Sequence, residues 1–128
     1  MSLISEVAEY LEDQGVGTVG TDIFVGYLPE SVVPSLAVID TGGLQPDRYL
    51  PTKEPTFQIY IRSATYSSGK AKLDAVRDAL HKQVNTTLVS AGEYIYFIFA
   101  ISEGGHLGRN PAGQDEFSMN FQARLRND

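Results

Sequence analysis

The stretch Phe117-Ser-Met-Asn-Phe-Gln-Ala-Arg-Leu-Arg126 alternates apolar and polar residues without interruption. Successive side chains of a β-strand point to opposite faces of the sheet, so this pattern predicts a ten-residue strand with one buried face. Residues 56–62 show the same period. They are predicted to form a second half-buried strand, with Phe57, Ile59 and Ile61 on one face and Gln58, Tyr60 and Arg62 on the other.

The sequence between these two segments predicts a helix and a further strand. The helix is expected from a cap at Ser67 or Ser68 to about Gln83 or Asn85, because apolar residues recur there at helical spacing. Its predicted buried stripe consists of Leu73, Val76, Leu80 and Val84. The run 94–102 is apolar on both faces, which fits a central strand. It also fits a strand covered by a helix on one side and by a neighbouring subunit on the other.

The first third of the chain predicts one helix and two strands. Ser2 can cap a helix that Gly15 ends, with an apolar face of Leu3, Ile4, Val7, Tyr10 and Leu11. The β-rich runs 22–28 and 35–40 are predicted to be neighbouring strands. Residues 41–55 and 103–114 are rich in Gly and Pro, so we expect two long loops there.

The predicted elements follow one another in the order helix, three strands, helix, two strands. This order predicts an α+β fold in which two helices pack on a single mixed, mostly antiparallel sheet of about five strands. The chain has 128 residues, of which 42% are hydrophobic. That amount of apolar material suits one core, so residues 1–128 are expected to form a single domain.

The composition excludes several classes of protein. The longest apolar run, 94–101, has eight residues, whereas a membrane-crossing helix needs about 20. The chain has no cysteine and two histidines, which excludes disulfides and cysteine-bound metal centres. A net charge of -6 argues against a module that binds duplex DNA. The N-terminus lacks the pattern of a secretory signal, so we expect the chain to stay where it is made.

The negative charge is concentrated in the first third of the chain. Residues 1–47 contain eight carboxylates and no Lys or Arg, whereas the remainder contains eight acids and ten bases. Glu6, Glu9 and Asp13 are expected to share the polar face of the first helix. Such a face is most often solvated surface, and otherwise it faces a partner or a channel.

Two features suggest chemistry, and neither has the context that the chemistry needs. The segment Gly15-Val-Gly-Thr-Val-Gly20 matches the dinucleotide-binding pattern, and Asp40 follows twenty residues later. That site requires a strand before the glycines and a helix after them, and here the order is reversed. The glycines are therefore predicted to end a helix and form a turn. His106 has no nucleophile nearby in the sequence and is predicted to be a surface residue, so we expect no cofactor, metal or catalytic site.

The order and spacing of several segments resemble a known family. These are residues 55–62, the helix with Ala71, Leu73, Val76 and Leu80, the strand 94–102, the loop that ends in Gly104-Gly-His-Leu-Gly-Arg109, and the run Phe117-Ser-Met-Asn-Phe121. Together they resemble the minor capsid and tail terminator proteins of long-tailed bacteriophages over residues 3–126. The resemblance implies a small protein that forms a hexameric ring on the last ring of the tail tube. Such a ring stops tube polymerisation and offers the surface to which the filled head attaches, and it has no catalytic residues.

The resemblance also implies partners and a location. The partners are further copies of the chain, which can be monomeric in solution, the tail tube protein, and a head-completion or neck protein. The location is the tail or neck of the virion, after assembly in the host bacterial cytoplasm. DNA only passes through such a ring, and neither a membrane nor a specific nucleic acid is expected as a partner.

Two sets of residues are candidates for roles in the ring. Tyr and Arg are enriched at protein interfaces, and the candidates for subunit contacts are Tyr60, Arg62, Tyr66, Tyr94, Tyr96 and Arg109. Stacking of Tyr60, Arg62 and Tyr66 on single-stranded nucleic acid is an alternative, which the lack of a wider basic surface disfavours. If the first helix lines the hole, its carboxylates would repel passing DNA. The lumen-facing candidates are then Glu6, Glu9 and Asp13.

Two other functions remain open from the sequence. One is a neck or head-completion protein that bridges portal and tail. The other is a small-ligand-binding or enzymatic α+β domain that uses the His106 loop or the glycine motif.

Overall fold

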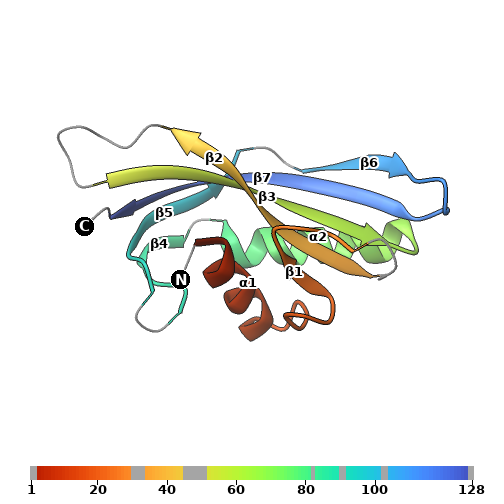
Figure 1. Ribbon diagram of the computed structural model, residues 1–128, viewed down its shortest axis with the longest axis horizontal. Coiled ribbons are helices and arrows are strands. Elements are labelled where there is room, and N and C mark those ends of the chain that lie inside the picture. Colours follow the sequence, from red (N-terminus) through yellow and green to blue (C-terminus); the bar gives the residue numbers. More distant parts are fainter. Residues whose placement is uncertain are drawn as a thin grey trace.

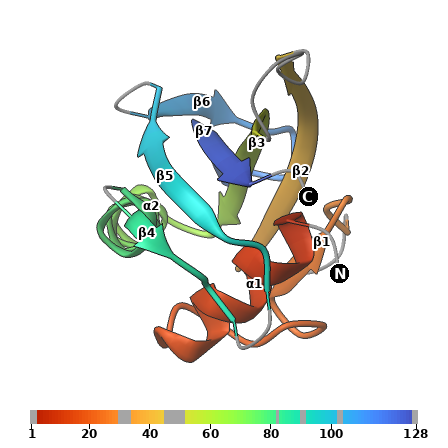
Figure 2. The same cartoon turned by 90° about the vertical axis from the view of Figure 1, so that its left-hand side faces the viewer.

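The computed structural model describes residues 3–29, 34–44, 52–81, 83–89, 92–101 and 104–126, and it has the predicted α+β architecture. Figure 1 shows both helices on the same face of one twisted sheet, and Figure 2 shows the strands arching over them. The elements are α1 (Leu3–Asp13), β1 (Ile23–Val25), β2 (Ser35–Leu44), β3 (Thr52–Ser63), α2 (Tyr66–Leu80), β4 (Gln83–Thr86), β5 (Ile95–Ala100), β6 (Gly105–Arg109) and β7 (Asp115–Arg126).

The strands β3 and β7, which the alternation predicts, form the middle of the sheet. The strand order is β1-β2-β3-β7-β5-β4, and β6 also pairs with β7. The pair β1 and β2 is parallel, and the other pairs are antiparallel. Phe57 lies opposite Phe121, and their rings are stacked with centroids 5.3 Å apart. Both rings are fully buried under the helices, so the period-two pattern defines the core face.

The edge of β7 away from β3 is shared by two strands. β6 pairs with residues 115–118 of β7, and β5 pairs with residues 121–125. This arrangement makes the sheet wider than the sequence indicates. The described residues contain seven strands, whereas about five were expected, and the two that the sequence missed are β4 and β6.

The helix α1 begins and ends close to the predicted positions. Its side chains Leu3, Val7 and Leu11 are buried at four-residue spacing. After Asp13 the N–H of Gly15 donates to the carbonyl of Glu12, and the N–H of Val16 donates to that of Leu11. This pair of bonds is a Schellman motif, and Gly15 adopts the positive φ of 80° that the motif requires.

The predicted end of the second helix is wrong. α2 ends at Leu80, and Val84 lies in β4 with 58% of its surface exposed. His81 adopts an extended conformation, after which residues 83–86 pair with β5. The four-residue spacing from Leu80 to Val84 fits a helix. Residues 83–86 instead form a strand, because they pair with β5, which is distant from α2 in the chain. The cap is Thr65 rather than Ser67 or Ser68, because its side chain accepts a hydrogen bond from the Ser68 N–H.

The two predicted long loops are also partly wrong. β2 continues to Leu44 and β3 begins at Thr52, so residues 41–44 and 52–55 lie in strands, and residues 45–51 lie outside the described residues. Gly42 and Gly43 have positive φ values of 95° and 123°, beside an irregularity in the ladder. In the second segment, Gly105–Arg109 forms β6 with an irregularity between His106 and Gly108. Glycine-rich sequence here produces irregular strands because each has a long neighbour on which to pair.

The predicted neighbouring strands 22–28 and 35–40 do pair. β1 shrinks to three residues, which lie parallel to Leu36, Ala37 and Val38 of β2. None of the helices in the described part of the chain is long and apolar enough to cross a membrane.

Candidate assembly surface

The sheet has one face covered by helices and one face that no described helix covers, which we call the outer face (Figure 1). The outward side chains of β7 are polar, as the alternation predicts. Those of β5 are apolar, because Phe97 lies opposite Arg124 and Phe99 lies opposite Gln122 on the outward-pointing positions. The outer face therefore carries an uncovered apolar strand beside a polar one.

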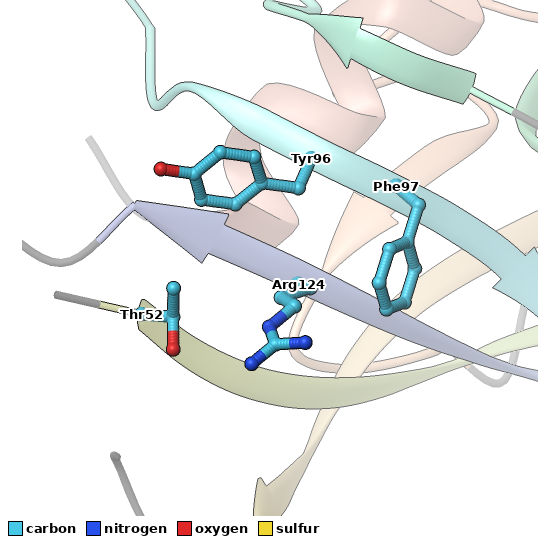
Figure 3. Close-up of a pocket in the computed structure, with 4 residues that line it drawn as sticks. All are labelled: Thr52, Tyr96, Phe97 and Arg124. Carbon is cyan, nitrogen blue, oxygen red and sulfur yellow. The ribbon is translucent and has the colours of Figure 1, made fainter. Parts of the chain in front are cut away.

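A β-bulge in β5 increases the apolar area on the outer face. Ile95 pairs with Leu125 and Phe97 pairs with Arg124, so Tyr96 is an extra residue in the ladder. Because Ile95 and Ile98 both point into the core, Tyr96 and Phe97 must both lie on the outer side. Figure 3 shows the two rings on either side of the Arg124 side chain. With Thr52 of β3 they line a shallow groove of about 330 Å³.

The aromatic rings of β5 and of Tyr94, which precedes it, contact one another in pairs. The rings of Phe97 and Phe99 have centroids 5.2 Å apart, and those of Tyr94 and Tyr96 lie 5.3 Å apart edge to face. Ile101 continues the row, since its N–H donates to the carbonyl of Asn120, and it is 53% exposed. We call the side chains of Tyr94, Tyr96, Phe97, Phe99 and Ile101 the apolar stripe. A contiguous apolar surface of this kind marks a site of protein contact.

Charged side chains border the apolar stripe. The Arg126 guanidinium lies 5.3 Å from the centre of the Tyr94 ring, in a cation–π contact. Arg124 Nε lies 3.5 Å from Glu54 Oε1, and Lys53 donates to Glu93 over 2.6 Å. An apolar centre with a polar rim is the usual anatomy of a protein interface.

The structure brings two of the predicted contact candidates, Tyr94 and Tyr96, together in the apolar stripe. Phe97, Phe99 and Ile101 were not candidates, and neither was Arg124. The signal that could have found them is the run 94–101, which is apolar on both faces although a helix covers only one.

Tyr60 and Arg62 lie on the outer face but are not the exposed pair that the sequence predicts. The Arg62 side chain is 12% exposed, with Nη1 donating to the carbonyl of Pro29 and Nε donating to Glu116. Pro29, which follows β1, therefore lies against the Arg62 side chain. Burial and a hydrogen bond to Glu116 raise the pKa of Tyr60. Both residues thus belong to an internal network.

Tyr66 and Arg109 lie near the start of β7, around His106. The His106 ring packs edge to face on Tyr66, with centroids 5.1 Å apart, and its Nε2 lies 2.9 Å from Asp115 Oδ1. Arg109 Nη2 donates to the other oxygen of Asp115 over 3.2 Å. Burial alone would raise the pKa of Asp115, but these hydrogen bonds outweigh it and lower the pKa. The cluster attaches β6 to the start of β7, which gives His106 a structural role.

The prediction that Glu6 shares an exposed face with Glu9 and Asp13 is wrong. Glu6 is 1% exposed, and its Oε1 accepts a hydrogen bond from the backbone N–H of Glu93. On a helix, positions 6 and 10 lie one turn apart on the same side, so Glu6 lies at the margin of the apolar face, where Gly92 and Glu93 pack against it. Glu9 and Asp13 are exposed. A role in a lumen therefore stays a prediction for these two.

The glycine motif forms the turn that its context predicts. Gly15 ends α1, and Gly20, with a φ of 89°, precedes β1. The side chain of Asp22 accepts the Thr18 N–H over 2.6 Å and closes the turn. Within the described ranges, no three His, Asp or Glu side chains gather as a metal site would require.

Comparison with known proteins identifies the family. A family model described as bacteriophage tail terminator protein matches residues 10–127. The chain belongs to this family. Tail terminators are structural components of the virion, so the chain is a structural phage tail protein and not an enzyme.

A solved structure has the same fold as this chain. A chain in the virion of a native gene transfer agent particle superposes with a TM-score of 0.73. The match covers 98% of this chain and 96% of that chain, with 16% sequence identity. At this identity the likeness concerns the fold. A search of curated proteins by sequence gives no match.

Proposed function

We propose that the chain forms a homo-oligomeric ring, a hexamer, on the last ring of the tail tube. There it stops tube polymerisation and offers the surface that the filled head joins. Its partners are then the tail tube protein and a head-completion protein, and assembly takes place in the cytoplasm of the host bacterium. A protein of this kind acts by surface complementarity and requires no chemistry of its own.

The observation that carries the proposal is the uncovered apolar stripe. Phe99 and Ile101 expose 37% and 53% of their surface on a sheet face that no described helix covers. Burial of apolar area contributes roughly 25 cal/mol per Å². A second subunit that covers this stripe would therefore stabilise the assembly relative to the free subunit. A strand with a helix on one side and a neighbour on the other is one of the two arrangements that the sequence predicts for residues 94–102.

The charge of α1 suits the passage of DNA through the ring. Glu9 and Asp13 are exposed one turn apart on α1, and residues 1–47 contain no base. We propose that they face the lumen, where like charge keeps the DNA from adhering to the wall. In the assembled ring, an outer-rim position of α1 would contradict this.

Growth of tail tubes in the presence of the chain tests the proposal. Purified tube protein should stop elongating when the wild-type chain is added, and native mass measurement should show rings or a monomer–ring equilibrium. The variant Phe99→Ser should lose both properties. Ala75→Ser provides the matched control, because Ala75 is exposed on α2, in the helix layer and away from the outer face. A wild-type chain that stays monomeric and leaves tube growth unaffected would overturn the proposal.

A neck or head-completion protein that bridges portal and tail is the second candidate. It would use the same stripe for assembly, so imaging of the chain in particles separates the two functions. A position at the tail end of the neck supports termination, whereas a position against the portal supports the alternative. No described contact favours a small-molecule site at His106, because its Nε2 is hydrogen-bonded to Asp115 within the chain.

A further inference from the structure

The inference concerns which surface of a second copy covers the apolar stripe, and it rests on the proposed ring. A ring of identical subunits needs two different patches at opposite flanks of each subunit, so that every contact is head to tail. The stripe lies on β5, near one end of the strand order, and β1 lies at the other end. Four strand spacings separate them, which is about 19 Å at roughly 4.8 Å per spacing.

The β1 end presents an exposed aromatic side chain. Tyr27 follows β1 and is 60% exposed, more than any other aromatic side chain in the described residues. The Tyr27 ring packs against the Phe24 ring, with centroids 5.7 Å apart, and this contact positions Tyr27 at the surface. β1 covers only residues 36–38 of β2, so the exposed Asp40 lies beyond it on the same flank. We call Phe24, Tyr27 and Asp40 the tyrosine flank.

The two flanks carry opposite charge. The tyrosine flank belongs to the part of the chain, residues 1–47, that holds eight carboxylates and no Lys or Arg. The stripe is bordered by three cations, Lys53, Arg124 and Arg126, and by two carboxylates, Glu93 and Glu54, which pair with Lys53 and Arg124. Its border therefore has a net positive charge, and Arg126 is exposed there. Two stripes facing each other across a two-fold axis would bring two positively charged borders together, and like-charge contacts weaken an interface. A stripe that meets the tyrosine flank avoids that repulsion.

We propose that the apolar stripe of one subunit packs against the tyrosine flank of the next subunit, head to tail around the ring. Tyr27 inserts beside Phe99 on the outer face, and Arg126 faces the acidic flank of the neighbour. The contact is heterologous, so it does not end at a dimer, and it forms a ring when the rotation between neighbouring subunits closes.

Disulfide trapping tests the pairing directly, because the chain contains no native cysteine. The double variant Tyr27→Cys/Phe99→Cys is oxidised on tail tubes and in concentrated solution, then analysed on a denaturing gel without reductant. We expect a ladder of covalent oligomers that stops at the ring size. Each single variant should remain monomeric on the gel. The matched control Tyr27→Cys/Ala75→Cys, with its second cysteine in the helix layer, should give no ladder.

The outcomes separate this pairing from the proposed function. If the double variant still forms rings and stops tubes but gives no ladder, the pairing is wrong and the function stands. If the double variant no longer assembles although the wild type does, a charge exchange between Arg126 and Asp40 decides the pairing. A covalent dimer from Phe99→Cys alone indicates a two-fold contact and also overturns the pairing. A cross-link from residue 99 to the tube protein would show that the stripe binds a different partner. If the wild-type chain neither assembles nor stops tubes, the function itself fails.

A charge exchange gives an independent measurement. Arg126→Glu should weaken ring formation at least tenfold in low salt, and Asp40→Lys should weaken it similarly. The double variant Arg126→Glu/Asp40→Lys should recover most of the loss, because the two flanks attract each other again with reversed signs. Equal loss in all three variants, with each still folded by circular dichroism, would contradict the role of charge.

Discussion

The carboxylate of Glu6 accepts a hydrogen bond from the backbone N–H of Glu93 over 2.8 Å, which ties α1 to the segment that leads into β5. The fit is close, because a Cβ on Gly92 would collide with the Glu6 carboxylate. The second oxygen, Oε2, has no hydrogen-bond partner among the described residues. Burial, the largest cause, therefore raises the pKa of Glu6.

The variant Glu6→Gln should flatten the pH dependence of stability. The pKa of Glu6 is higher in the folded chain than in the unfolded chain, so the folded state binds more protons between the two values. The free energy of unfolding of the wild type should thus rise as pH falls from neutral toward the ordinary pKa of glutamate. Gln keeps an acceptor for the Glu93 N–H and removes the titration, so this rise should be smaller.

Denaturant titrations at neutral and mildly acidic pH measure this difference. The control is Glu9→Gln, on the same helix but exposed, which should keep the wild-type slope. If Glu6→Gln and Glu9→Gln show the same slope as the wild type, the raised pKa of Glu6 is not a property of the folded chain.

Two phenylalanines should separate stability from assembly. Phe121 is fully buried and stacked on Phe57, so Phe121→Ala should lower the free energy of unfolding by about 3–5 kcal/mol. Phe99 is 37% exposed on the outer face, so Phe99→Ser should change the monomer by about 1 kcal/mol or less, while assembly is lost. Thermal unfolding and native mass measurement on both variants check the contrast. Equal destabilisation would show that Phe99 is part of the core.

The variant Asp115→Asn should loosen β6 without unfolding the domain. Asp115 accepts hydrogen bonds from His106 and Arg109, and these lower its pKa. Because the pKa is lower in the folded chain, the stabilisation is present above the ordinary pKa of aspartate. It is lost as pH falls through the lowered value. Backbone amides of β6 should exchange with deuterium faster in the variant than in the wild type.

The matched control for that measurement is Asp78→Asn, whose side chain is 80% exposed on α2. Its exchange pattern in β6 should equal that of the wild type. Unchanged protection of β6 in Asp115→Asn would mean that backbone pairing with β7 alone holds the strand.

The variant Gly69→Ala should destabilise the domain although alanine favours helices. Gly69 lies in the first turns of α2, where an added Cβ would collide with the Phe117 ring. Overpacking of this kind costs about 1–3 kcal/mol, which exceeds the gain of about 1 kcal/mol in helix propensity. Ser67→Ala, an exposed position in the same turn, should be neutral or slightly stabilising in chemical denaturation. A more stable Gly69→Ala chain would show that Phe117 can move aside.

The parts of the fold that could be predicted are those with a local signal. Phe57, Ile59 and Ile61 alternate with polar residues, and all three are fully buried as expected. The edge strands β4 and β6 have no such signal, since they are short, and β6 contains two glycines. They form because β5 and β7 offer unpaired edges, which is a property of residues far away in the chain.

The assembly surface was only partly predictable for the same reason. Tyr94 and Tyr96 could be chosen as contact candidates by residue type. Arg62 could not be excluded as a candidate, because the sequence does not show its hydrogen bond to Pro29, which is distant in the chain. Glu6 shows the converse: helical periodicity alone does not reveal which later segment packs against the margin of the apolar face.

The sequence by itself determined the α+β class, the two central strands, the concentration of carboxylates in residues 1–47 and the family resemblance. Each of these follows from the local spacing of residues or from the composition. Only the tertiary structure decided that Tyr96 and Phe97 lie on the same side of β5, and that Glu6 is buried against Glu93. Strand register and packing are set by partners distant in the chain, because a hydrogen-bonded ladder shifts by a residue only where its neighbouring strand accommodates the bulge.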